Sequence, residues 1–221
     1  MAWYWHRLVP LLEKADHDVV AVDLPAETAG LSDYAELVVR TIDRRSHVVL
    51  VAQSLGGFTA ALVCDRAPIE MLVFVNAMIP ASGETAGDWW GNTGAVEARI
   101  ASAKERGYSS EFDVATYFLH DVPERVLRDG PPRQREQAGI AFVEPCQFRG
   151  WPGIPTHVVA SADDRFFPLS FQRSVARERL HKEVDVLSGG HLVALSNPKG
   201  LASLLLGFAR ELPDVARARS G

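Results

Sequence analysis

The stretch from His47 to Ala60 constrains the fold of this chain more than any other. Residues 48–52 form a continuous apolar run, typical of a strand buried on both faces of a parallel sheet. The run stops at Gln53, and helix-forming residues begin at Phe58. The pattern therefore predicts a strand, a short turn and a helix, with Ser54 on the turn.

The residues beside Ser54 fit a nucleophile elbow. A serine on a sharp strand-to-helix turn projects its hydroxyl above the sheet, and the turn needs small neighbours. Ala52 and Gly56 supply them in A-Q-S-L-G, a partial match to G-x-S-x-G with alanine as its first residue. The N–H of Leu55 can donate to an oxyanion near the positive end of the helix. Taken alone, the motif fits a helix-capping serine equally well.

Length, charge and composition exclude several classes of protein. With 221 residues, the chain can bury one sizeable core, or a core and a small subdomain. A net charge of -5 gives no reason to expect a nucleic-acid partner. No apolar stretch reaches the length of a membrane span, and residues 1–10 do not resemble a signal peptide, so we expect a cytoplasmic protein without membrane contact. Cys64 and Cys146 are too few for a disulfide framework or a metal site.

Apolar strands alternate with amphipathic helices along most of the chain. The predicted strands are Asp18–Val22, Val48–Ala52, Met71–Val75, Thr156–Ser161 and the edge-like Glu183–Leu187. Helices are predicted over Trp5–Leu12, after Ser32–Asp33, from Phe58, over Pro168–Leu180 and after Asn197–Pro198. This alternation predicts an α/β fold with a mostly parallel sheet flanked by helices.

The alternation disappears between Met78 and Trp151, where the chain is rich in aromatic residues. Helical patterns occur there near residues 96–106 and 111–119. We interpret residues 79–151 as a helical cap, inserted after the third recognisable strand. Residues 1–78 and 152–221 then form the two parts of one α/β core, and the residues after Pro213 are expected to be a loose tail.

Two later loops carry candidate partners for Ser54. Asp164 follows the 156–161 strand, and His191 follows the last strand behind two glycines that permit a sharp turn. The chain order serine, aspartate, histidine is that of a hydrolase triad. Asp163 is the alternative acid, but the spacing to Pro168 favours Asp164. The other histidines are interpreted as surface or packing residues: His6, His17, His47, His120, His157 and His181.

The sequence resembles α/β-hydrolase-fold proteins of the cap-bearing esterase type, similar to the methylesterase and hydroxynitrile lyase branch. The matching motifs are V-V-A-V-D-L-P at 19–25, V-A-Q-S-L-G-G at 51–57, D-D-R-F-F-P at 163–168 and G-G-H at 189–191. The resemblance covers nearly the whole chain. It implies that Ser54 is the nucleophile, His191 the general base and Asp164 the orienting acid, and it implies no cofactor or metal.

The resemblance also implies a strand and a His-Gly loop before the first helix, and that loop donates a second oxyanion N–H. Residues 1–5 hold no such motif. We therefore expect an N-terminally truncated sheet in which the 48–52 strand keeps a free edge. Either the 18–22 strand or a second copy in a homodimer would cover that edge. Losing one oxyanion donor typically lowers the rate by ~10²–10³.

The expected function is a serine hydrolase that cleaves a small carboxylic ester through an acyl-enzyme. A hydroxynitrile lyase-like enzyme that uses the same triad as a base is one alternative. The other is a catalytically weak or silent member of the fold. The sequence leaves the identity of the ester open.

Overall fold

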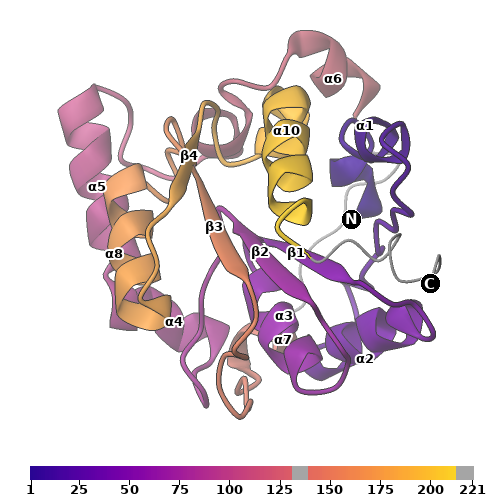
Figure 1. Cartoon of the computed structure of the whole chain (residues 1–221). Helices are drawn as coiled ribbons and strands as arrows, with labels where there is room; N and C mark the ends of the chain where they lie inside the picture. The colour runs from indigo at the N-terminus through magenta and orange to yellow at the C-terminus, as the bar shows by residue number, and fades with distance from the viewer. Residues whose placement is uncertain (131–138, 213–221) are drawn as a thin grey trace.

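The computed structural model describes residues 1–130 and 139–212, which contain a four-stranded parallel sheet (Figure 1). The strands lie in the order β1 (Val49–Gln53), β2 (Met71–Val75), β3 (Thr156–Ser161) and β4 (Asp185–Leu187). Helices cover both faces. The predicted α/β fold is confirmed, and β4 is an edge strand as its alternating residues predicted.

The side chains of β2 explain why its sequence is apolar throughout. All five of its residues are buried. Leu72 and Phe74 pack into a core with α2 (Leu31–Ile42), α3 (Gly56–Cys64) and α8 (Leu169–Leu180). The alternate residues of β2 face the opposite core, which is formed with α1 (Val9–Glu13) and α10 (Pro198–Ala209). A strand between two helical layers has no polar face, hence the continuous apolar run.

Between β2 and β3 the chain forms a set of mostly short helices, and we call residues 79–151 the insert. Its helices are α4 (Ala86–Thr93), α5 (Ala95–Arg106), the π-helix η2 (Ala115–Leu119), α6 (Glu124–Asp129) and α7 (Ile140–Val143). The helix predicted near 96–106 is confirmed. The one predicted over 111–119 is shorter, because Asp113 accepts the Thr116 N–H and η2 starts only after it. The boundaries of a separate cap stay a prediction.

The N-terminal part differs most from the prediction. The helix expected over residues 5–12 is divided into a short 3₁₀ turn (Ala2–Trp5) and α1. The strand predicted over Asp18–Val22 is wrong, so the insert follows the second strand of the sheet and not the third. Residues 18–22 line a groove of about 870 Å³ together with β1, and they pair with no strand of the described residues.

β1 therefore ends the sheet within the part of the chain that the structure describes. This agrees with the expectation of a free edge, and the homodimer expected to cover it stays a prediction. Two smaller corrections concern helices. The helix predicted to begin after Ser32–Asp33 has Gly30 as its N-cap, and Asp33 accepts the Gly30 N–H. The short helix α9 (Val193–Ser196) was not predicted.

The helices of the described ranges include none that is long and apolar enough to cross a membrane. The tail predicted after Pro213 lies outside the described residues.

Candidate active site

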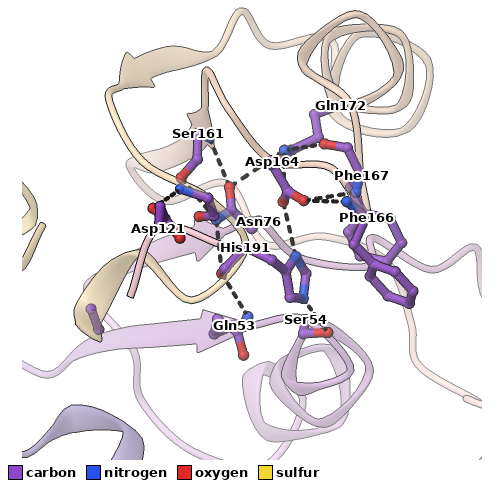
Figure 2. Close-up of polar contacts among 12 residues, drawn as sticks. Gln53, Ser54, Asn76, Asp121, Ser161, Asp164, Phe166, Phe167, Gln172 and His191 are labelled. Carbon is purple, nitrogen blue, oxygen red and sulfur yellow. Dashed lines mark hydrogen bonds and ion pairs between the residues drawn. The ribbon is translucent and has the colours of Figure 1, made fainter. Parts of the chain in front are cut away.

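Polar residues follow each of the four strands at the same edge of the sheet. Ser54 comes after β1 and Asn76 after β2, while Asp164 and His191 lie in the loops after β3 and β4. The carboxyl ends of parallel strands share one edge, which is where sites form in open α/β sheets. Figure 2 shows these four side chains gathered there.

The backbone around Ser54 has the strained form of an elbow. Ser54 has a φ of +52°, a left-handed value uncommon for a residue other than glycine. Its carbonyl accepts the N–H of Met78 at 3.0 Å, which holds the turn against the end of β2. A Cβ on Gly57 would lie 1.8 Å from the Met78 carbonyl oxygen, so only glycine fits there.

Alanine fits where the elbow motif usually has its first glycine. A Cβ placed on Gly56 would lie 3.9 Å from the Cβ of Ala52, which is an ordinary contact distance. One small residue at each position is therefore enough. The departure from G-x-S-x-G leaves the turn intact.

A chain of hydrogen bonds joins the three residues singled out by the sequence. His191 Nε2 lies 3.2 Å from Ser54 Oγ, and His191 Nδ1 lies 2.9 Å from Asp164 Oδ2 (Figure 2). Because an ionised carboxylate only accepts, Nδ1 carries the proton and Nε2 is left to accept from Ser54. His191 and Asp164 are each 1% exposed. Asp163, the alternative acid, has an exposed side chain.

Asp164 is held in place by its own loop. Its Oδ1 accepts the N–H groups of Phe166 and Phe167 at 2.8 and 2.9 Å. Gln172, on α8, approaches Oδ2 with its amide at 3.4 Å. These donors stabilise the ionised carboxylate and fix the oxygen that faces His191.

Asn76 is the site residue that the sequence analysis missed. Its side-chain oxygen accepts the Ser161 N–H at 2.8 Å, and its amide donates to the carbonyls of Gly190 and His191, each at 3.1 Å. Asn76 thereby ties the end of β3 to the loop that carries His191. The sequence did hold one indication of this role. Asn76 is a polar residue directly after an apolar strand, at the edge of the sheet where the other site residues were expected.

Three phenylalanine rings surround the His191 imidazole. Phe118, from the insert, stacks on it with the ring centroids 5.0 Å apart and the planes inclined by 30°. Phe166 and Phe167, from the Asp164 loop, approach it more edge-on, with centroid distances of 5.1 and 5.2 Å. An apolar shell of this kind lowers the local dielectric and strengthens the polar contacts inside it.

The N–H of Leu55 lies at the start of α3, and no acceptor within the described ranges takes it. The groove beside β1 extends to Ser54 and Leu55, but its lining includes neither His191 nor Phe118. A carbonyl oxygen beside Ser54 could accept the Leu55 N–H together with the positive end of α3.

No group of three or more histidine, cysteine, aspartate or glutamate side chains within residues 1–130 and 139–212 is arranged to hold a metal ion. Both cysteines are free. Cys146 Sγ approaches the Phe58 carbonyl at 3.5 Å.

The two thiols are expected to be unreactive in the folded protein. Burial raises the pKa of Cys64 to about 11 and that of Cys146 to about 12, so both stay protonated at pH ~8. We expect iodoacetamide to spare both at that pH and to alkylate both once guanidinium unfolds the chain. Peptide mass spectrometry of the two samples measures this, and fast alkylation of native Cys146 would contradict it.

The sequence profile of the alpha/beta hydrolase family matches residues 1–204. The chain belongs to this family. A curated relative, the alpha-hydroxynitrile lyase of Arabidopsis thaliana, is 28% identical, and the match covers 95% of this chain and 93% of that protein. Methylesterase 3 of the same plant is 26% identical, with coverages of 95% and 92%. These relatives confirm the expected branch of the alpha/beta hydrolase family.

Solved structures agree on the fold. The alpha/beta hydrolase described here superposes on a pyrethroid hydrolase from Sphingobium faniae with a TM-score of 0.73 and 22% identity. That match covers 95% of this chain and 92% of the other. At this identity the likeness supports the architecture and says nothing of the substrate.

Proposed function

We propose that this protein is a serine hydrolase that cleaves a small carboxylic ester through an acyl-enzyme. The observation that carries the proposal is the hydrogen-bonded chain from Ser54 Oγ through His191 to Asp164, with distances of 3.2 and 2.9 Å. A nucleophile, a base and an orienting acid within hydrogen-bond reach are the parts that acyl transfer needs.

In the first half of the reaction, Ser54 Oγ attacks the ester carbonyl carbon while His191 Nε2 takes the hydroxyl proton. Asp164 holds the imidazole in the required tautomer and stabilises its positive charge. The carbonyl oxygen becomes an oxyanion that accepts the Leu55 N–H. When the tetrahedral intermediate collapses, the bond to the alcohol breaks, and the alcohol leaves with the proton from His191.

In the second half, water attacks the acyl-enzyme. His191 removes a proton from the water, and the new tetrahedral intermediate again places its oxyanion at the Leu55 N–H. Collapse releases the carboxylic acid and returns the proton to Ser54 Oγ. The cycle consumes one water per ester and needs no metal or cofactor.

The rings around His191 support an ester with an apolar acyl or alcohol group. Phe118 and Phe166 lie against the imidazole. Phe118 belongs to the insert, and Phe166 belongs to the core. We propose that the insert acts as a cap over the reacting bond. The similarity to methylesterase 3 supports a short alcohol as the leaving group.

A fluorophosphonate probe tests the proposed nucleophile directly. We expect one adduct per chain in the intact mass, located on Ser54 by peptide mapping, and turnover of short-chain aryl and methyl esters. A folded wild-type protein that forms no adduct and hydrolyses none of these esters would contradict the proposal.

A matched pair of variants tests whether Asp164 or Asp163 is the acid that orients His191. Asp164→Asn keeps the shape of the side chain but removes the charge that orients His191, so we expect kcat to fall by about 10⁴-fold. Asp163→Asn changes an exposed side chain one residue earlier, and its kcat is expected to stay near wild type. Steady-state ester kinetics distinguish the two, and a reversed order would reassign the acid.

A lyase is the second candidate, because the 28% identical relative is an alpha-hydroxynitrile lyase. In that reaction the same base would take the proton of a cyanohydrin hydroxyl, and the C–C bond would break to give a carbonyl and cyanide. Departing cyanide needs a positioned cationic or polar group besides the His191 imidazolium, whereas the rings around His191 are phenylalanines. Cyanide release from mandelonitrile without ester turnover would favour the lyase over the esterase.

A further inference from the structure

The loop that carries His191 is bound by a carboxylate of the insert. Asp121 lies just after η2, and its Oδ2 accepts the N–H of Gly190 at 2.5 Å. Gly190 directly precedes His191. Figure 2 shows the Asp121 carboxylate turned toward this loop, on the side away from Ser54.

The Gly190 peptide is held from two directions. Asp121 takes the N–H, while Asn76 donates to the carbonyls of Gly190 and His191, each at 3.1 Å. Gln53 adds a donor to the His191 carbonyl at 3.3 Å. Asn76 and Gln53 belong to the core, whereas Asp121 belongs to the insert, so its hydrogen bond connects this backbone to the insert.

Glycine at position 190 is what lets the carboxylate come so close. A Cβ there would lie 2.6 Å from Asp121 Oδ1 and 2.8 Å from His120 Nε2. Both distances are shorter than real contacts of this kind, so a side chain would displace the carboxylate. The G-G-H motif therefore serves the contact with Asp121 as well as the turn.

The segment that carries Asp121 also contacts the imidazole. Phe118, in η2, stacks on the His191 ring, and Arg165, next to Asp164, donates to the Thr116 carbonyl of η2 at 3.3 Å. π-helical turns are rare and occur frequently at functional sites. Residues 115–121 thus contact His191 through its ring and through the peptide that precedes it.

We propose that Asp121 is a positioning residue for His191, through which the insert controls the reactivity of Ser54. The proposal rests on the proposed function. Asp121 does not touch the reacting atoms. It fixes the Gly190 peptide, and that peptide sets where the imidazole lies between Ser54 and Asp164. Without the acceptor, the Gly190 N–H has no partner, and the loop relaxes away from this position.

The test uses four variants of the full chain. Asp121→Leu has a similar volume and no acceptor, Asp121→Asn keeps one acceptor oxygen, and Asp129→Leu removes an exposed carboxylate of the same insert as a control. If the leucine variant does not fold, Asp121→Ala removes the same acceptor without filling the space. Circular dichroism and the guanidinium midpoint establish folding.

Two measurements follow the position of the base. One is the second-order rate of fluorophosphonate labelling of Ser54. The other is the low-field proton NMR signal of His191 Nδ1–H bound to Asp164, which needs no turnover. A misplacement of about 1 Å typically costs ~10²-fold in rate, so we expect Asp121→Leu to slow labelling by roughly 10- to 100-fold.

The low-field signal is expected to broaden or disappear in Asp121→Leu and to persist in Asp121→Asn and Asp129→Leu. A folded Asp121→Leu that labels at the wild-type rate with its signal intact would overturn the proposal. So would an Asp121→Asn variant as impaired as the leucine variant. An unlabelled wild type would contradict the proposed function instead, and the NMR signal would then decide the role of Asp121 by itself.

Discussion

Ser54→Ala is expected to lose fluorophosphonate labelling altogether and nearly all of its ester hydrolysis. The variant removes the attacking oxygen, which His191 Nε2 approaches at 3.2 Å, and leaves the rest of the site in place. In comparable triads the loss of the serine lowers kcat by about 10⁶-fold, with residual catalysis from binding and the oxyanion donors. Turnover of an activated aryl ester, measured against the uncatalysed rate, gives the size of the effect.

His191→Ala, compared with Ser54→Ala and with the double variant, tests whether the two residues act in the same step. Since residues of one triad act as a unit, we expect its loss to be similar and the double variant to be no worse than either single one. Additive losses would mean that Ser54 and His191 do not act in the same step. Retained turnover in Ser54→Ala would remove Ser54 as the nucleophile.

Gly57→Ala is expected to give the largest loss of stability. Its Cβ would lie 1.8 Å from the Met78 carbonyl oxygen, which is backbone and cannot rotate away. The Met78 N–H is itself bound to the Ser54 carbonyl, so a shift of this segment would also break the elbow. We expect the free energy of unfolding to fall by about 3 kcal/mol or more, measured by guanidinium denaturation.

The neighbouring glycine provides the control. A Cβ on Gly56 would meet only the Cβ of Ala52, at 3.9 Å, and both glycines lie in α3. Gly56→Ala is therefore expected to be neutral or to stabilise the protein by about 0.5–1 kcal/mol, because alanine loses less backbone entropy in a helix. An equal loss in both variants would show that the Met78 contact is not the cause.

The core of the fold could be predicted because its strands lie between two helical layers. β2 and β3 were found with their observed bounds, since a strand buried on both faces leaves a continuous apolar run. Ser54, Asp164 and His191 could be predicted to meet because they follow parallel strands, whose carboxyl ends share one edge.

The parts that could not be predicted depend on contacts between distant segments. Residues 18–22 have the composition of a strand, but a strand exists only beside a partner, and a groove separates them from β1. Asn76 and Asp121 bind backbone groups, which leave no mark in the sequence of the residues they hold. Their roles emerge only once the loops are placed in space.

The contact between Asp121 and Gly190 constrains how this enzyme fold can be re-engineered. Exchange of residues 79–151 for the corresponding segment of a relative would replace the Phe118 ring that stacks on His191, and it would also replace the acceptor that holds the histidine loop. A chimaera therefore needs a carboxylate or amide at the position of Asp121, opposite a glycine. Grafts chosen for substrate range alone are expected to bind their new esters and turn them over slowly.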